Sequence, residues 1–359
     1  MTQIDNLMGP DRIPERQERE RKLRIVINGF GRIGRTAFKV VLDRHPDEVE
    51  VVAINDLMEP ATLAHLLKYD SVYGVYPKEV SSDERDLIVN GQKYPIFAEK
   101  EPAKLPWNNL GVDVVIESTG RFTKLEEALK HITAGAKKVV VSAPAKETPT
   151  VLLGVNEDTY QGQDVINNAS CTTNCIAPVA KVMEGAFGIK KAMMTTIHAL
   201  TAEQNLVDGP PPGGKAGDLR RARAASVNII PTTTGAAIAT TEAIPGLRGK
   251  FDGVALRVPV ICGSIADFTF LLNKKVTVEE VNKALTDAAL KSNGILAVSS
   301  DSLVSSDIIG RSESAIVDLS LTQVVDGDMV KVFAWYDNEW GYSNRLIEQV
   351  IQVGKSNSS

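Results

Sequence analysis

One cysteine of this sequence lies where its thiol could do chemistry. Cys171 occurs in NNASCTTNCIAP (residues 167–178), directly after Ser170, a good residue for capping the start of a helix. In the first turn of a helix, free backbone amides and the helix dipole favour a thiolate. Buried packing is the other interpretation of Cys171 taken alone. Cys175 lies one turn later and is expected to be an unreactive core residue. Two cysteines at this spacing without further ligands make a poor metal site, so we expect no metal.

A nucleophilic cysteine usually works with a base, and His198 is the candidate. It ends the strand-like stretch MMTTIH, whereas His45, His65 and His131 lie in or beside amphipathic helical stretches earlier in the chain. Paired with a thiolate, His198 would be held cationic and would pass a proton to and from a substrate oxygen. A histidine hydrogen-bonded within a strand is the alternative, because the sequence does not show that the two side chains touch.

A glycine-rich turn near the start of the chain predicts a dinucleotide site. Gly29, Gly31 and Gly34 form G-x-G-x-x-G between the strand-like LRIVI (23–27) and a helical stretch. Such a turn lets a pyrophosphate approach the backbone amides at the start of a helix. Asp56 ends the next strand-like run, where an acid would accept the ribose hydroxyls and repel a 2′-phosphate, which favours NAD over NADP. The alternative interpretations are that the glycines form an ordinary turn and that Asp56 is a turn residue at the end of a strand, without a role in binding.

The pattern of apolar residues predicts an α/β fold in two parts. Short Val- and Ile-rich runs at 23–27, 49–54, 112–118 and 136–143 alternate with amphipathic helical stretches, which is typical of a parallel sheet covered on both faces. From about Cys171 onward, strand-like runs dominate. Polar and apolar residues alternate in RVPVICGSIADFTF, as in a strand of an antiparallel sheet with one covered face. We therefore expect a doubly wound parallel sheet of Rossmann type plus an α+β catalytic domain with a mostly antiparallel sheet.

The expected division of the chain follows from the same pattern. Residues 1–22 are expected to be a solvated tail, residues 23–170 a nucleotide-binding domain completed by a C-terminal helix at 339–355, and residues 171–338 the catalytic domain. The 359 residues, 43% hydrophobic and 24% charged, are typical of a globular protein of more than one domain.

Charge and cysteine content exclude several classes of function. A formal net charge of −5 gives no bulk attraction to polyanions, so nucleic acid is not expected as the primary partner. No apolar run approaches the length of a membrane span, and no membrane partner is expected. Three cysteines allow no dense disulfide framework, which predicts a cytoplasmic protein.

Several motifs together resemble one family. In chain order they are INGFGRIGR, NNASCTTNC, TTIHALTA, RRARAA, NIIPTTTGAA, RVPV and WYDNEWGYSNR. Their order and spacing resemble glyceraldehyde-3-phosphate dehydrogenase over residues 23–353. The resemblance implies a phosphorylating, NAD-dependent enzyme of glycolysis and gluconeogenesis, and a homotetramer. It further implies that Cys171 attacks the aldehyde to give a thiohemiacetal, with His198 as acid and base, and that inorganic phosphate cleaves the resulting thioester.

The resemblance also implies the binding residues. Thr201 and Arg257 match the subsite for the C3 phosphate of glyceraldehyde 3-phosphate. Positions around the attacking phosphate are matched by Ser170, Thr172, Arg221, Thr234 and Gly235. Besides the three glycines, the NAD positions are matched by Arg32, Ile33, Asp56, Lys100, Ser142, Asn338 and Tyr342. Asn338 would fix the carboxamide of the nicotinamide, and Tyr342 would pack beside its ring.

The sequence departs from the family pattern in places, and it leaves alternatives open. The segment 208–220 is longer than its bacterial counterpart, although Pro210 keeps a proline often found in members that prefer NAD. Ile261 and Cys262 are unusual and are expected to lie away from the chemistry. An erythrose-4-phosphate dehydrogenase, which shares the thiol but mostly hydrolyses its thioester, is the close alternative. A protein or nucleic-acid binding module using the dinucleotide crevice is the alternative from another class.

Overall fold

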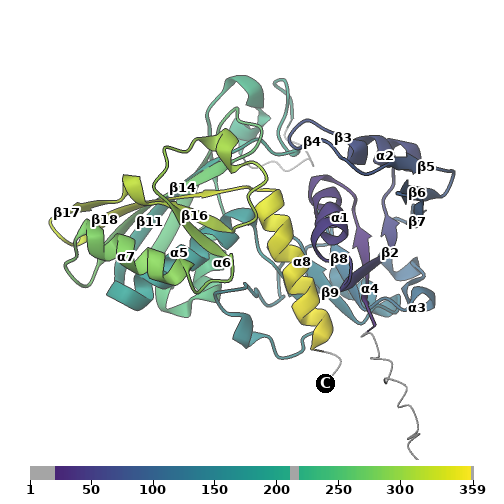
Figure 1. The fold of residues 1–359 in the computed structure, drawn as a ribbon, viewed down its shortest axis with the longest axis horizontal. Helices are drawn as coiled ribbons and strands as arrows, with labels where there is room; N and C mark the ends of the chain where they lie inside the picture. Colours follow the sequence, from purple (N-terminus) through teal and green to yellow (C-terminus); the bar gives the residue numbers. More distant parts are fainter. Residues whose placement is uncertain (1–20, 211–217, 357–359) are drawn as a thin grey trace, which may run out of the picture.

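The computed structural model describes residues 21–210 and 218–356, and two large sheets dominate it (Figure 1). Most of the expected tail, residues 1–20, and the middle of the long 208–220 segment lie outside the described residues. Arg21, within the described part, pairs with Asp113 at 2.8 Å.

The first sheet is the expected parallel one. In spatial order its strands are β10 (Val165–Asn167), β9 (Lys138–Val141), β8 (Val114–Glu117), β1 (Leu23–Asn28), β2 (Val49–Asn55), β7 (Gln92–Phe97), β6 (Asp86–Val89) and β5 (Val80–Ser82). Pairing is parallel from β10 to β7 and antiparallel from β7 to β5. The accompanying helices are α1 (Arg32–Arg44), α2 (Pro60–Lys68), α3 (Trp107–Leu110) and α4 (Leu125–Thr133). The order reverses at β1, where such sheets bind their ligands.

The second sheet is mostly antiparallel, as expected. Its path runs through β12 (Ile230–Thr233), β13 (Phe251–Arg257), β11 (Ile189–His198), β14 (Ser264–Leu272), β18 (Met329–Tyr336), β16 (Ala315–Asp318) and β15 (Leu296–Ser299), with β17 (Gln323–Val325) beside β18. Only β11–β13 and β15–β16 pair in parallel among its described strands. A separate two-stranded sheet consists of β3 (Tyr69–Asp70) and β4 (Gly74–Val75).

Three helices cover one face of the second sheet. They are α5 (Cys171–Phe187), α6 (Ala236–Ala243) and α7 (Val278–Ala289), and α7 starts with a complete capping box at Thr277 and Glu280. Burial alternates along β14, so that Phe268 and Phe270 face the helices and their neighbours face outward. Helix α5 continues through Pro178.

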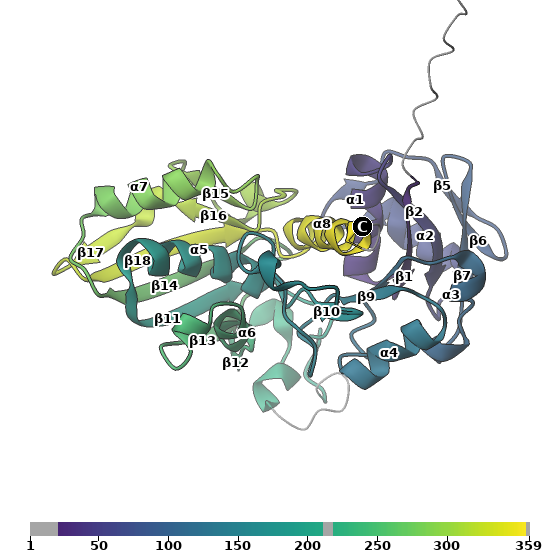
Figure 2. The same ribbon diagram turned by 90° about the horizontal axis from the view of Figure 1, so that it is seen from below.

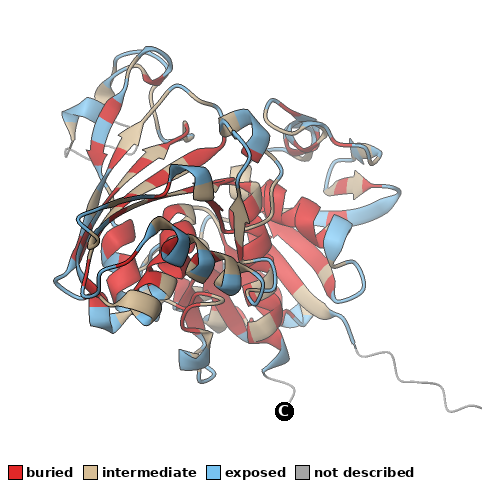
Figure 3. Cartoon of the chain, turned by 60° about the vertical axis from the view of Figure 1, so that its left-hand side comes forward, coloured by how far each residue is buried: buried red, intermediate tan, exposed pale blue. Residues whose placement is uncertain are grey.

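The last helix, α8 (Trp340–Lys355), lies between the two sheets (Figures 1 and 2). It packs against α1, and Leu346, Ile347 and Val350 join the core under the first sheet. Figure 3 shows the buried segments in the interior helices and strands of both halves, with exposed segments in the outer loops. The end of the chain thus returns to the nucleotide-binding half and brings the β18–α8 junction to the boundary between the sheets.

Candidate active site

The cysteine and the histidine singled out in the sequence meet in the structure. Ser170 caps α5, because its Oγ accepts a hydrogen bond from the amide of Thr173 at 3.0 Å. Cys171 is consequently the first residue of the helix, and His198 is the last residue of β11. The Cys171 sulfur lies 3.4 Å from Nε2 of His198. Cys175 is fully buried in the second core, as expected.

Neighbouring strands fix the orientation of the imidazole. His198 and Arg257 are paired residues at the ends of the parallel strands β11 and β13. Nδ1 of His198 lies 2.7 Å from the carbonyl oxygen of Ala199 and 2.6 Å from Nη1 of Arg257. The guanidinium can only donate, so of these two neighbours only the carbonyl of Ala199 can accept the proton of Nδ1. In the tautomer in which Nδ1 donates to Ala199, Nε2 presents its lone pair to the sulfur and can accept the thiol proton.

Burial decides the charge state of this pair. Burial raises the pKa of the Cys171 thiol to about 11, although the positive charge of Arg257 lowers it in part. Burial and the same guanidinium together lower the pKa of His198 to about 3. The neutral thiol and imidazole are therefore favoured near pH 7. Burial and Arg257 thus oppose a cationic His198, and the imidazolium expected when His198 is paired with a thiolate stays a prediction.

Tyr336 supports the pair and was missed in the sequence. Its hydroxyl is bonded to Thr172 Oγ1 at 3.0 Å and to Thr196 Oγ1 at 2.7 Å, so it connects α5 with β11. Its ring meets that of His198 edge to face, with 6.1 Å between the centroids. Burial alternates along β18 and places Tyr336 inward, while its two partners depend on how α5 and β11 pack.

Two arginines gather beside the histidine, with a carboxylate between them. Nη2 of Arg257 lies 3.3 Å and Nη1 of Arg221 lies 3.6 Å from Oε1 of Glu203. Thr201 lies two residues before Glu203, and its buried Oγ1 has no partner among the described residues. The expected anion-binding residues Thr201, Arg221 and Arg257 thus share one region. Glu203 was missed by the sequence analysis. Its carboxylate pairs with both arginines, so an anionic ligand would compete with it for them.

The other residues expected around a phosphate lie at the starts of α5 and α6. The hydroxyl of Ser170 is engaged in capping α5, and that of Thr172 is bonded to Tyr336 in the core. Gly235 is the exposed residue at the start of α6, and Oγ1 of Thr234 accepts from the amide of Ala236 at 3.2 Å. Helices α5 and α6 pack together.

The glycine turn has the geometry that a dinucleotide site requires. Gly29 has a φ of +94°, and a Cβ there would lie 2.6 Å from the amide nitrogen of Thr119. A Cβ on Gly34 would collide with the carbonyl oxygen of Gly29. A Cβ on Gly31 would meet nothing within 4 Å, so the start of α1 faces open space where a pyrophosphate can approach. Asp56 braces the turn by accepting from the amide of Phe30 at 2.7 Å.

The remaining nucleotide-binding candidates lie along the same edge of the first sheet. Half-buried Ile33 lies at the start of α1, while exposed Lys100 follows β7 and half-buried Ser142 follows β9. Arg32 differs, because its guanidinium is paired with Asp70 at 2.9 Å and with Glu339. Its side chain ties α1 to the residues before α8 and does not point freely toward a cofactor.

Asn338 and Tyr342 bring the β18–α8 junction to the same crevice. Oδ1 of Asn338 accepts from the amide of Gly263 at 3.2 Å and from Ser264 Oγ at 2.9 Å. The hydroxyl of Tyr342 donates to the carbonyl oxygen of Ala169 at 3.1 Å, next to the start of α5. Cys262 was expected to lie away from the chemistry; it is buried 3.8 Å from Oδ1 of Asn338 and donates to Asp337.

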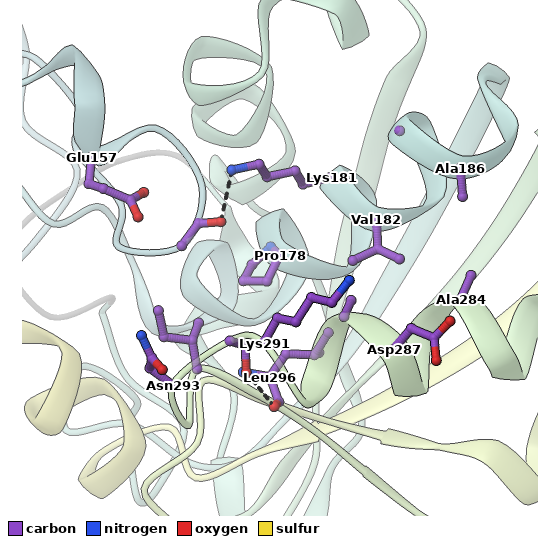
Figure 4. A pocket seen from close by; sticks show the side chains of 15 residues that line it. Glu157, Pro178, Lys181, Val182, Ala186, Ala284, Asp287, Lys291, Asn293 and Leu296 are labelled. Carbon is purple, nitrogen blue, oxygen red and sulfur yellow. Dashed lines mark hydrogen bonds between the residues drawn. The ribbon is translucent and has the colours of Figure 1, made fainter.

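A cavity of about 650 Å³ lies elsewhere, between α5 and α7 (Figure 4). Pro178, Val182 and Leu296 contribute apolar surface, and Nζ of Lys181 donates to the carbonyl oxygen of Gly154 at its edge. It contains none of the residues expected in the site.

Comparison with known proteins agrees with this geometry. A family model described as the NAD binding domain of glyceraldehyde 3-phosphate dehydrogenase matches residues 23–125, and the model of its C-terminal domain matches residues 170–338. The chain belongs to the glyceraldehyde-3-phosphate dehydrogenase family. Within this family, the chain is 53% identical to the enzyme of that name from Streptomyces coelicolor over 339 residues, covering 92% of this chain and 98% of the relative.

Two further members of the family are similarly close. A glyceraldehyde-3-phosphate dehydrogenase from Geobacillus stearothermophilus is 53% identical over 335 residues, covering 92% of this chain and 98% of the relative. Glyceraldehyde-3-phosphate dehydrogenase 1 from Bacillus subtilis is 52% identical over 339 residues, covering 93% and 98%. The names of these relatives do not favour the erythrose-4-phosphate alternative.

Family membership makes the protein an NAD-dependent oxidoreductase. The residues present fit that cofactor: Gly31 leaves the helix start open, and Asn338 has its oxygen engaged while its amide nitrogen remains to meet a carboxamide oxygen. Over residues 21–210 and 218–356, no helix is long and apolar enough to cross a bilayer.

Proposed function

We propose that the protein oxidises D-glyceraldehyde 3-phosphate to 1,3-bisphosphoglycerate with reduction of NAD+, in glycolysis or gluconeogenesis. The observation that carries the proposal is the 3.4 Å contact between the Cys171 sulfur and Nε2 of His198, beside clustered Arg221 and Arg257. A thiol with an adjacent base is what covalent aldehyde oxidation requires. The arginines are suited to phosphate groups.

The first step is addition of the thiol to the aldehyde. His198 accepts the thiol proton at Nε2 while the sulfur of Cys171 bonds to the carbonyl carbon, and the same proton passes to the carbonyl oxygen. The product is a thiohemiacetal. The backbone amide of Cys171 and the imidazole stabilise the negative charge that develops on this oxygen, as the position of Cys171 at the start of α5 allows.

The second step converts the thiohemiacetal into a thioester. Nε2 of His198 removes the hydroxyl proton as the carbon–oxygen double bond forms and a hydride leaves that carbon. Bound NAD+ supplies the hydride acceptor. Inorganic phosphate then attacks the thioester carbon, the carbon–sulfur bond breaks and the acyl phosphate departs, and the proton held at Nε2 of His198 returns to the sulfur of Cys171.

The binding residues divide between three groups of contacts. Thr201 and Arg257 hold the C3 phosphate of the substrate; Ser170, Thr172, Arg221, Thr234 and Gly235 surround the attacking phosphate. The cofactor is held by Gly29, Gly31, Arg32, Ile33, Gly34, Asp56, Lys100, Ser142, Asn338 and Tyr342. The side chain of Arg32 acts by bracing α1, since it is paired with Glu339.

The proposal includes the division of the chain and its assembly. Residues 23–170 with 339–355 form the NAD-binding domain, residues 171–338 form the catalytic domain, and four copies form a homotetramer in the cytoplasm. The packing of α8 on α1 supports the return of the C-terminal segment to the first domain.

Assay of NADH formation tests the function. Glyceraldehyde 3-phosphate with NAD+ and phosphate is expected to give rapid reduction, arsenate to replace phosphate, and NADP+ to serve poorly because of Asp56. The variant Cys171→Ser should lose activity by about three orders of magnitude or more, and Cys175→Ser should retain it. Comparable rates with erythrose 4-phosphate and no dependence on phosphate would favour the hydrolytic alternative instead.

A further inference from the structure

We infer that Ser264 is a positioning residue that couples the cofactor-holding Asn338 to the segment carrying His198. The hydroxyl of Ser264 accepts from the amide of Ala199 at 3.0 Å and donates to Oδ1 of Asn338 at 2.9 Å. The inference rests on the proposed function, in which Asn338 meets the carboxamide of the nicotinamide.

The network leaves one orientation for the carboxamide of Asn338. The amide of Gly263, 3.2 Å away, can only donate, so the atom of Asn338 that faces it is the oxygen. The Ser264 hydroxyl donates to the same oxygen, since its own lone pair already accepts from Ala199. Nδ2 of Asn338 is consequently the atom left to donate to a carboxamide oxygen.

The same hydroxyl acts on the histidine side. Ala199 follows His198, and its carbonyl oxygen lies 2.7 Å from Nδ1 of the imidazole. The residue whose carbonyl oxygen orients the imidazole therefore has its own amide bound to Ser264. Ser264, Ala199 and Asn338 are buried, which removes water as a ready substitute for any partner lost.

The register of the second sheet places this serine at the junction. Ser264 begins β14 and pairs with Tyr336, the last residue of β18, two residues before Asn338. Ile265, the next residue of β14, pairs with Ile197 of β11. One side chain thus reaches both the nicotinamide-binding junction and the end of the histidine strand, and fixes their relative position.

The variant Ser264→Ala tests the inference with two readouts on NAD. Removing the hydroxyl leaves Oδ1 of Asn338 with the 3.2 Å hydrogen bond from the Gly263 amide and the long contact from Cys262 Sγ, so the carboxamide is held less firmly in the position that presents Nδ2. We expect the KM for NAD+ to rise about tenfold, corresponding to the loss of one well-made buried hydrogen bond. We also expect deuterium from an aldehyde labelled at C1 to reach both faces of the nicotinamide, whereas the wild type uses one face; the NMR spectrum of the reduced cofactor distinguishes them.

Ser314→Ala is the matched control. Ser314 is also buried in the catalytic half, but its hydroxyl has no partner among the described residues. It should leave the KM for NAD+ and the deuterium distribution unchanged. Ser264→Cys keeps a side chain of similar volume and a weak hydrogen-bond donor, so its KM for NAD+ and its deuterium distribution should lie between those of the wild type and Ser264→Ala. It replaces the alanine variant in the test if that variant does not fold.

Two outcomes overturn the inference. One is that Ser264→Ala and Ser264→Cys match Ser314→Ala in both NAD readouts; the other is that they lower only kcat or thermal stability, which assigns Ser264 a merely structural role. Failure of the proposed function is separate, because then the wild type itself would not reduce NAD+ with the aldehyde. The effect of the serine on NAD affinity would still be measurable by direct titration.

Discussion

The guanidinium of Arg257 acts on both members of the Cys171–His198 pair. Its positive charge lowers the pKa of the thiol, which favours the thiolate, and it also lowers the pKa of the imidazole, which opposes the imidazolium. A proton taken from sulfur is therefore poorly retained on His198. The arrangement favours its rapid transfer to the oxygen of the substrate, as the addition step requires.

Replacing Arg257 should displace the pH profile of thiol alkylation. In Arg257→Gln the lost positive charge lets the pKa of the Cys171 thiol rise, so the rate of reaction with iodoacetamide should reach its plateau at a higher pH than in the wild type. No substrate is needed, so a loss of phosphate binding does not confuse the result. Arg221→Gln is the control, because Arg257 is the charged group with the largest effect on this thiol, and loss of Arg221 should leave the profile nearly in place.

Glu203 should oppose binding of the phosphorylated substrate. Its carboxylate forms ion pairs with the guanidinium groups of Arg257 and Arg221, and a bound anion would compete with it. In Glu203→Gln, the KM for glyceraldehyde 3-phosphate should fall about threefold, a modest effect because half of this side chain is exposed and screened. The KM for unphosphorylated glyceraldehyde should not change; an equal change for both aldehydes would contradict the role.

At the level of elements, the glycines in the turn between β1 and α1 differ in their surroundings. At Gly29 and Gly34 a Cβ would meet backbone atoms, so these glycines serve close packing, while Gly31 faces open space and is the glycine proposed to let the ligand approach. The variants at Gly34 and Gly31 therefore form a matched pair within one turn.

Gly34→Ala and Gly31→Ala should fail in different ways. The Cβ of the first collides with the backbone carbonyl of Gly29, which cannot move aside as a side chain could, so the free energy of unfolding should fall by about 2 kcal/mol. The second should fold normally and raise the KM for NAD+ about tenfold, because its methyl occupies the surface a pyrophosphate approaches. Thermal unfolding and kinetics measure both; equal loss of stability in the two variants would contradict the division.

The elements that were predictable are those with a strong local pattern. β1, β2, β8 and β9 are Val- and Ile-rich runs, and α7 carries its capping box in the sequence. The 3.4 Å contact of Cys171 and His198 was a hypothesis only, because it depends on β11 ending beside the start of α5. The residues missed, Tyr336, Glu203 and Ser264, are defined by contacts between distant segments, which periodicity and propensity do not encode.

The surroundings that act on the charge of the pair could not be predicted for a similar reason. A cysteine in the first turn of a helix has a locally favourable field, and that much can be deduced from the sequence. The depth of burial and the approach of Arg257 to Nδ1 of His198 result from packing of β11, β13 and α5. These long-range effects oppose the local one, because burial raises the pKa of the thiol, and burial together with Arg257 lowers the pKa of the imidazole.

At the scale of the molecule, the second sheet has one face without a helix over it among the described residues. Helices α5, α6 and α7 pack on the inner face. The outward residues of the neighbouring strands β11 and β13 include Met193 and Val254, with 58% and 47% of their surface exposed. Exposed apolar residues on a regular sheet face are typical of an interface, and they support the proposed tetramer.

Val254→Lys should therefore weaken assembly without disturbing the fold. An ammonium at a half-exposed strand position costs little in a single chain, but it would be buried without a partner when a second copy covers the sheet. Light scattering should give the mass of four chains for the wild type and smaller species for the variant. Leu290→Lys, at the end of α7 on the opposite side and 82% exposed, is the control and should remain tetrameric. In a symmetric assembly the lysine is present in every subunit, so each interface on this face would bury it. If both variants nevertheless keep the wild-type mass, copies of the chain do not meet at the uncovered face of the second sheet.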